Sequence, residues 1–263
     1  MLNQEPTKIE TDPRKYMTLV YGIAGVGKTT FCSQIPDHYF LITEPGTEGV
    51  EVYGSVVQSW EDFLRLGEEL IKAKQEDFAG QRRIEVIVID TYEALYKMAG
   101  EWICMHETFL VRGRAQHFNK IEDVPWALGY RRTSELVLEK LLKLKRMGYG
   151  IFLTSHAKER TVTWRGEEVS HFGPNLSQAS AEALVNACGA VGFFTMEQEV
   201  ERTEEKKIVR ESRWMYWQPQ FMRVAKHRLA GFPEKLPLPL NGWEVYVNAF
   251  KETLSKERGD AAR

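Results

Sequence analysis

The sequence predicts an α/β fold with a central, mostly parallel β-sheet flanked by helices, and antiparallel strands towards the C-terminus. Three observations predict it. Apolar runs alternate with amphipathic segments, the run 84–90 is almost entirely β-branched, and a glycine-rich stretch separates the first apolar run from the first helical segment. Continuous β-branched runs are typical of strands buried on both faces of a parallel sheet. Alternating strands and helices favour right-handed crossovers around one such sheet.

The first part of the chain gives the clearest elements. Apolar runs predict strands at residues 17–22, 39–43, 84–90 and 149–156. The segments 59–74 and 133–148 have apolar residues three and four apart, which is the spacing of amphipathic helices, and a shorter helix is expected to begin at the Gly-Lys-Thr-Thr stretch. Residues 1–14 carry prolines among charges without a hydrophobic period, so we expect a flexible leader there.

After residue 156 the pattern changes. We expect an exposed hairpin over 161–172, a helix over 177–191, two antiparallel strands at 207–218 and 220–229 joined at Pro219, and a last amphipathic helix over 243–258. No composition break marks a second domain. Residues 15–263 are therefore expected to form one domain, with the Pro-rich segment and last helix, 232–257, attached to it.

Composition is that of an ordinary globular protein. The 263 residues are 43% apolar and 27% charged, with a formal net charge of −2, so any nucleic-acid site must be a local basic patch. Three widely spaced cysteines favour a reducing compartment. The N-terminus lacks the apolar stretch of a signal peptide and no apolar run is long enough for a bilayer, so a cytoplasmic location without membrane contact is expected.

A phosphate-binding loop is the strongest motif. Residues 22–29 fit G-x-x-x-x-G-K-[S/T]. The glycines let backbone N–H groups turn towards a polyphosphate, and the following helix directs its N-terminus at the same charge. Lys28 is expected to bridge the β- and γ-phosphates of ATP, and the Thr29 hydroxyl to hold Mg²⁺. The predicted nucleotide-binding residues are Gly22, Ile23, Ala24, Gly25, Val26, Gly27, Lys28, Thr29 and Thr30.

Asp90 ends the β-branched run and is the second predicted metal-binding residue. Its carboxylate can bind the water shell of the magnesium ion beside the phosphate loop. An aspartate at a strand end can also simply start a turn. The phosphate loop favours the metal-binding interpretation.

Other phosphate-loop classes fit less well. A GTPase would need D-x-x-G after the strand and N-K-x-D for guanine, but Asp90 is followed by Thr-Tyr-Glu, and the nearest guanine-like stretch, 119–122, does not follow a strand. A nucleoside kinase would carry a compact Arg-rich lid, which we do not find. An AAA+ motor places its catalytic glutamate directly after the aspartate, where this chain has Thr91.

Four stretches in order, GIAGVGKTTF, FLITEPGTE, VIVIDTYEAL and IFLTSHAKE, resemble the AAA_24 phage nucleotide-binding proteins. These include RecA-like single-strand annealing proteins of the Sak type found in bacteriophages. The resemblance extends from Tyr16 to about Arg228. Its first and third stretches are generic to phosphate-loop ATPases, whereas T-E-P-G-T-E and T-S-H are more specific. The resemblance implies a RecA-like recombination ATPase core.

The resemblance implies two further catalytic roles. Glu44, which follows the strand 39–43 and precedes a Pro-Gly turn, occupies the place of the water-activating glutamate of RecA-like ATPases, with Glu48 and Glu93 as alternatives. His156 ends the strand 149–156, where those proteins carry a polar γ-phosphate sensor that is often glutamine. Each residue could instead be an ordinary polar side chain at a strand end.

The same resemblance implies two single-stranded DNA-binding loops, one within 111–120 and one after His156. Cations beside an aromatic side chain suit phosphate contacts and base stacking. The later loop also carries three glutamates, as an ordinary exposed hairpin would. The candidate DNA-binding residues are Arg112, Arg114, Lys120, Lys158, Arg160, Trp164 and Arg165.

Lys226 and Arg228 are the last candidate catalytic residues. They alternate on an expected strand, so both side chains should point the same way. RecA-like rings and filaments send such a pair into the neighbouring subunit's nucleotide site, where it stabilises transition-state charge. A plain exposed strand would look the same in sequence.

The function predicted is an ATP- and Mg²⁺-dependent recombination ATPase that assembles into a ring or filament, binds single-stranded DNA and promotes annealing or strand exchange. The alternative is an ATP-dependent oligomeric switch or scaffold in phage replication or packaging without DNA binding of its own. A small-molecule kinase is a third possibility.

Overall fold

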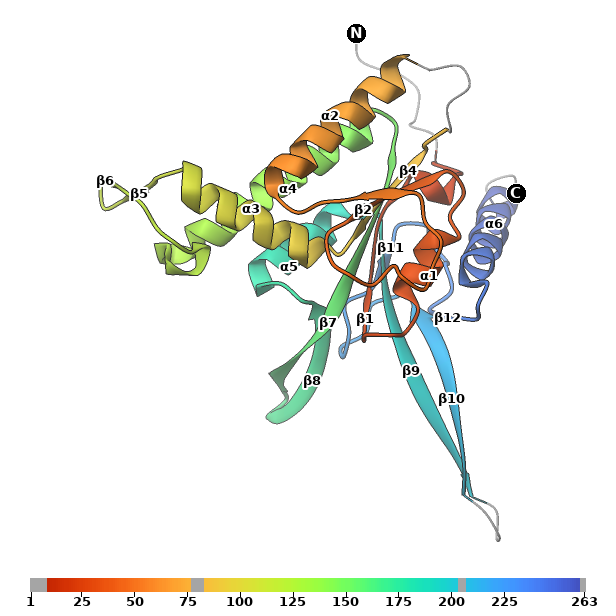
Figure 1. The fold of residues 1–263 in the computed structure, drawn as a ribbon. Helices are drawn as coiled ribbons and strands as arrows, with labels where there is room; N and C mark the ends of the chain where they lie inside the picture. The colour runs from red at the N-terminus through yellow and green to blue at the C-terminus, as the bar shows by residue number, and fades with distance from the viewer. Residues whose placement is uncertain (1–8, 77–82, 203–206, 261–263) are drawn as a thin grey trace.

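The structure, a computed structural model, describes residues 9–76, 83–202 and 207–260. A single sheet in the order β12-β10-β9-β1-β7-β4-β2-β3 forms its centre (Figure 1). These strands are β12 Lys235–Pro237, β10 Lys207–Tyr216, β9 Ala190–Arg202, β1 Met17–Gly22, β7 Gly150–Trp164, β4 Val86–Asp90, β2 His38–Ile42 and β3 Gly54–Val56. The six strands from β9 to β3 are parallel, and β10 and β12 are antiparallel. The predicted fold class is confirmed.

Helices cover both faces of the sheet. They are α1 Lys28–Ser33, α2 Trp60–Glu76, α3 Tyr92–His106, α4 Leu128–Arg146, α5 Gln178–Ala187 and α6 Gly242–Asp260. One buried cluster packs α2 to α5 against the sheet, through residues such as Leu95 and Val137. A second cluster packs α1 and α6 on the other face, through residues such as Phe31 and Phe250. The sheet is therefore buried on both sides, as its β-branched strands predict.

Two hairpins extend from the edge of the sheet at which the parallel strands end (Figure 1). β7 continues past His156 and pairs with β8 Glu167–Pro174, turning at Arg165 and Gly166 as predicted. β9 continues in the same direction and pairs with β10. Since β7 and β9 are the two neighbours of β1, the phosphate loop lies between the roots of both hairpins.

Two sequence-based boundaries towards the C-terminus are wrong. The predicted helix over 177–191 ends at Ala187, and β9 begins at Ala190. This strand, and not residues 220–229, is the antiparallel partner of β10. In the 220–229 segment only β11, Lys226–His227, pairs with the sheet, and its partner is also β9. In addition, α4 begins at Leu128, five residues before the predicted start.

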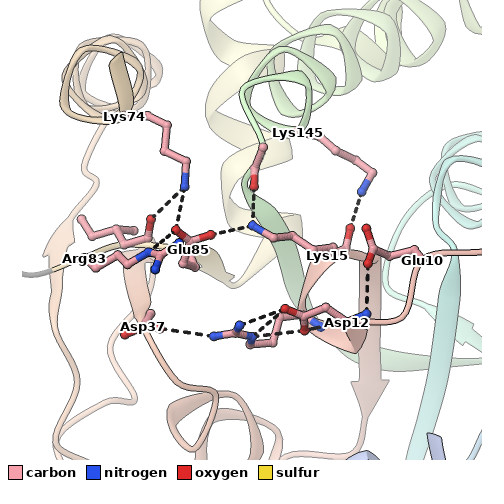
Figure 2. Close-up of polar contacts among 11 residues, drawn as sticks. Glu10, Asp12, Lys15, Asp37, Lys74, Arg83, Glu85 and Lys145 are labelled. Carbon is pink, nitrogen blue, oxygen red and sulfur yellow. Dashed lines mark hydrogen bonds and ion pairs between the residues drawn. The ribbon is translucent and has the colours of Figure 1, made fainter. Parts of the chain in front are cut away.

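At the end of the sheet where the parallel strands begin, three cations form ion pairs with the buried Glu85 (Figure 2). Glu85 is 5% exposed and accepts hydrogen bonds from Lys15 at 2.6 Å, Lys74 at 2.9 Å and Arg83 at 2.6 Å. Burial alone would raise the pKa of Glu85, but these three cations lower it to about 2. The cluster joins the residues before β1, the end of α2 and the start of β4.

Residues 1–8 of the predicted leader lie outside the described part of the chain. From residue 9 onwards the leader is described: Asp12 accepts the backbone N–H of Arg14 at the start of a 3₁₀ turn, Pro13–Lys15. The Arg14 guanidinium bonds to both Asp12 oxygens and reaches Asp37 at 3.2 Å (Figure 2). These contacts attach residues 12–14 to the loop before β2.

Candidate nucleotide-binding site

The glycine-rich loop joins the end of β1 to the start of α1. Gly25 and Gly27 have φ values of 73° and 109°, which favour glycine over other residues. At Gly22 a side chain would collide with the carbonyl oxygen of Phe194 on β9. These glycines are required by the backbone path, as the motif predicts.

Lys28 lies inside this loop. Its side chain is 7% exposed, and its Nζ donates to the carbonyl oxygens of Gly22 at 3.1 Å and Ile23 at 2.9 Å. Burial lowers the pKa of Lys28, although Asp90 and Glu93 partly oppose this effect. Among the described residues, its hydrogen-bond acceptors are backbone carbonyls, which carry no net charge, so the ammonium group is well placed for an anion.

Asp90 is the polar centre of the site. Its Oδ2 accepts a hydrogen bond from Thr29 Oγ1 at 2.7 Å, and its Oδ1 accepts one from Thr154 Oγ1 on β7. The carboxylate is thus held by hydroxyls from α1 and β7. Thr29 and Asp90 lie side by side as the sequence predicts, and their oxygens fit Mg²⁺, which binds proteins through one or two such ligands and takes the rest from phosphate and water.

Glu44 lies two residues beyond the end of β2 and is half-buried. Its Oε2 accepts a hydrogen bond from Thr91 Oγ1 at 3.1 Å. Thr43 holds the same segment, because its Oγ1 donates to the Thr91 carbonyl at 2.8 Å and accepts the Thr91 N–H at 2.7 Å. Glu44 therefore stands beside the residue that follows Asp90. The alternative Glu48 lies in the exposed loop.

His156 lies at the level of Gly22 in the pairing of β7 with β1. Its backbone N–H and ring Nδ1 both bond to Glu93 Oε1, at 2.8 and 2.7 Å. Glu93 comes from the first turn of α3 and its side chain is 11% exposed. The second alternative to Glu44 is thus the partner of His156.

One cavity of about 270 Å³ brings these predicted residues together. It is lined by Ala24, Gly25, Gly27, Lys28, Thr29, Thr30, Glu44, Pro45, Gly46, Val50, Asp90, Thr91 and His156. The phosphate loop supplies one wall, and the residues after β2, the end of β4 and His156 within β7 supply the others. A buried cation, a hydroxyl–carboxylate pair and a half-buried carboxylate around one cavity form a site suited to a polyphosphate and a metal ion.

Residues 14–229 match the family described as AAA domain, AAA_24. The chain belongs to this family. The match covers the phosphate loop and every strand from β1 to β11, so the site just described is the AAA-type, nucleotide-binding part of a phosphate-loop NTPase core. No curated protein matches the chain. Within the described residues, none of the helices combines the length and the apolar character needed to cross a membrane.

The predicted DNA-binding residues fall into separate groups. Arg112 and Arg114 are exposed on the small hairpin of β5 Phe109–Val111 and β6 Arg114–Gln116, which protrudes beyond α3 (Figure 1). Arg165 lies at the turn of the β7–β8 hairpin, and Arg160 donates to the carbonyl oxygen of Leu176. The side chain of Trp164 lies outside the described part of the structure.

Lys120 and Lys158, one from each predicted loop, meet at a second cavity of about 630 Å³. Its other lining residues are Glu93, Tyr96, Lys97, Gly100, Glu101, Cys104, Asn119, Ile121, Glu122, Tyr130, Asn175, Leu176 and Ser177. Glu93 lines this cavity and bonds to His156, which lines the phosphate-loop cavity. The Glu93–His156 pair is therefore the wall that the two cavities share.

Lys226 and Arg228 lie at the opposite end of the sheet from the phosphate loop of their own chain. β11 pairs with the first residues of β9, whereas Gly22 pairs with Phe194 further along that strand. Lys226 Nζ donates to the carbonyl oxygens of Val185 at 3.0 Å and Asn186 at 3.4 Å, at the end of α5. Arg228 is exposed.

Sequence analysis missed Thr154 and Thr91 as members of the site. Thr154 bonds to Asp90 from a strand 64 residues later, and Thr91 bonds to Glu44 from 47 residues away. The only sequence signal is positional: Thr154 lies two residues before His156 on β7, and Thr91 directly follows Asp90. Polar residues near the carboxyl ends of parallel strands lie at the same edge of the sheet, so the positions of Thr154 and Thr91 are those expected of site residues.

Proposed function

We propose that this protein is a Mg²⁺-dependent ATPase of RecA-like type that binds single-stranded DNA and promotes annealing or strand exchange, as in the Sak-type proteins it resembles. The observation that carries the ATPase assignment is Asp90, whose carboxylate bonds to Thr29 at 2.7 Å beside the buried ammonium of Lys28. That combination suits a metal-bound triphosphate. Magnesium supplies charge neutralisation at the terminal phosphates when it is bound.

In this proposal each residue around the phosphate-loop cavity has a separate role in ATP hydrolysis. Lys28 stabilises phosphate charge within the loop, and Thr29 and Asp90 hold the metal ion. Glu44 orients and deprotonates the attacking water, because it is a half-buried carboxylate that lines the cavity and one of its oxygens accepts a hydrogen bond from Thr91. His156 senses the terminal phosphate from the middle of β7, where it pairs with Gly22 at the end of β1.

The DNA-binding part of the proposal is supported by the second cavity. Lys120 and Lys158 contribute cations and Tyr130 an aromatic ring to a space large enough for a nucleotide unit. Because Glu93 and His156 form the wall between the cavities, DNA there would act on the γ-phosphate sensor. The exposed arginines of the β5–β6 hairpin extend the basic surface.

The experiment is an ATPase assay with and without a single-stranded oligonucleotide, on a sample whose mass is followed by light scattering. We expect hydrolysis that requires Mg²⁺, is lost in Lys28→Ala, and rises with DNA as the protein assembles. Lys120→Ala/Lys158→Ala should weaken DNA binding. The slope of log K against log salt concentration should also become shallower, by the amount expected for the loss of about two phosphate contacts. Arg65→Ala/Lys72→Ala, which removes two exposed cations of α2, is the charge-matched control.

The same assay tests the alternatives. Hydrolysis without DNA stimulation and without DNA-dependent assembly would favour an ATP-dependent oligomeric switch or scaffold, to which the near-neutral net charge of −2 is suited. Transfer of phosphate to a small molecule instead of water would identify a kinase.

A further inference from the structure

Arg213 on β10 lies beside the phosphate loop of its own chain. Its Nη1 is 3.9 Å from the position that a Cβ would take on Gly27. The guanidinium is exposed, and it forms no hydrogen bond or ion pair with any residue in the described part of the chain. A long cationic side chain held against a phosphate loop is available for an anion in that loop.

The sheet explains how a residue so far along the chain arrives there. Gly22 pairs with Phe194 on β9, and Phe194 pairs with Met215 on β10. Arg213 is two residues from Met215, so it points to the same face as α1 and lies just past the level at which β1 ends. Met215 itself is buried in the cluster that contains α1 and α6.

The Pro-rich segment holds Arg213 in this position. Leu238 N donates to the carbonyl oxygen of Arg213 at 2.9 Å, and the Leu238 side chain also approaches Gly27. Further on, the Leu240 carbonyl accepts a hydrogen bond from Gln34 at the end of α1, and Trp243 N donates to the same glutamine. The segment and the start of α6 thus contact the residues that flank α1, Gly27 and Gln34.

The position of the metal-binding pair decides which end of the nucleotide Arg213 meets. Asp90 ends β4, which is two strands from β1 on one side, whereas β10 is two strands from β1 on the other. A magnesium ion held by that pair would neutralise charge at the terminal phosphates. A bound nucleotide would therefore have its terminal phosphate towards β4, and its α-phosphate and nucleoside would extend towards β10.

We propose that Arg213 binds the α-phosphate of the nucleotide held by its own subunit, with the Pro-rich segment 238–240 bordering the nucleoside. The inference rests on the proposed ATPase function. A planar guanidinium pairs with two oxygens of one phosphate, so it complements Lys28 from the opposite end of the polyphosphate. Since ADP and ATP share the α-phosphate, Arg213 should contribute equally to the binding of both.

The test is calorimetric titration of ADP and of ATP, with Mg²⁺, into Arg213→Ala, Arg213→Lys and the parent protein. Both dissociation constants should rise by about tenfold in Arg213→Ala and by less in Arg213→Lys, with the thermal midpoint unchanged. The control is Arg210→Ala, which removes the same charge from the other face of the same strand. Its dissociation constants should stay within about twofold of the parent values.

Each other outcome has a distinct meaning. Equal weakening in Arg210→Ala would show a general charge effect, and loss of ATP affinity alone would place Arg213 at the γ-phosphate. If the parent binds both nucleotides and Arg213→Ala binds them with the same affinity, this inference is overturned and the proposed function is left intact. A parent protein that binds neither nucleotide would overturn the proposed function itself.

Discussion

His156 Nδ1 lies 2.7 Å from Glu93 Oε1, and the same carboxylate oxygen accepts the backbone N–H of His156 at 2.8 Å. A residue in the middle of β7, at the level where β1 ends, is thus attached twice to the first turn of α3. The imidazole, which lines the phosphate-loop cavity, is held by a group that lines the neighbouring cavity.

If His156 senses the γ-phosphate, its loss should slow chemistry without weakening ADP binding. His156→Ala is expected to lower the ATPase kcat by about 10- to 100-fold, with the dissociation constant for ADP unchanged. Glu93→Ala should have a smaller effect, because the imidazole remains but is no longer held. His106→Ala, at the exposed end of α3, is the control and should behave as the parent. A parent-like kcat in His156→Ala would remove this residue from the reaction.

Glu44→Gln should separate binding from hydrolysis. The amide keeps the size of the side chain and an oxygen for Thr91, but it cannot take a proton from water. We expect kcat to fall by about 10²- to 10⁴-fold while ATP still binds and any assembly persists. Glu48→Gln changes a nearby exposed carboxylate and should leave kcat within twofold. Equal losses in the two variants would rule out a specific role for Glu44.

A role of Arg228 in the nucleotide site of a neighbouring subunit can be tested by mixing two variants that are each expected to be inactive. Arg228→Ala keeps its own phosphate loop, and Lys28→Ala keeps Arg228, so each supplies what the other lacks. If the arginine acts across a subunit interface, each variant alone should lose about 10³-fold or more of kcat, and the mixture should regain activity. Lys226→Ala should be less affected, since its ammonium bonds to α5 carbonyls. Full activity in Arg228→Ala alone would exclude the role.

Glu85 should make stability depend on pH in a defined window. Its pKa is about 2 in the folded protein against an ordinary value of 4.5, so the folded state favours the ionised form. The resulting stabilisation, about 3 kcal/mol, is complete above pH 4.5 and is lost as the pH falls towards 2.

Urea unfolding of Glu85→Gln would measure this contribution. The free energy of unfolding should drop by about 2 to 3 kcal/mol at pH 7, and the gap from the parent should narrow as the pH falls from 4.5 towards 2. Glu69→Gln, which removes the carboxylate of an exposed ion pair with Arg65, is the control. It should change the free energy of unfolding by less than about 0.5 kcal/mol. A difference in unfolding free energy between parent and variant that stays constant with pH would contradict the ion-pair explanation.

The nucleotide site could be predicted largely because its parts are local in sequence. The phosphate loop is eight consecutive residues, and Glu44, Asp90 and His156 each follow a recognisable apolar run. Parallel strands then bring these ends to one edge without further information. What joins them could not be predicted: the Glu93–His156 and Thr154–Asp90 contacts depend on how α3 and β7 pack, over 63 and 64 residues.

The errors near the C-terminus have a similar cause. Residues 177–191 are rich in alanine, so the helical pattern runs past Ala187 into the start of β9. The outer half of β9 is polar and charged because it stands in a hairpin beyond the sheet, where no helix covers it. Such a strand lacks the apolar signal by which the buried strands are recognised.

The two hairpins that grow out of the strands beside β1 have a mechanical consequence. β7 runs for eight residues past His156, a length of roughly 27 Å. A tilt of about 5° at its root would carry the tip through roughly 2 Å, by the geometry of a rigid strand of that length. The base of each hairpin adjoins the phosphate loop. A small change in angle at the base therefore becomes a larger displacement at the tip of the hairpin.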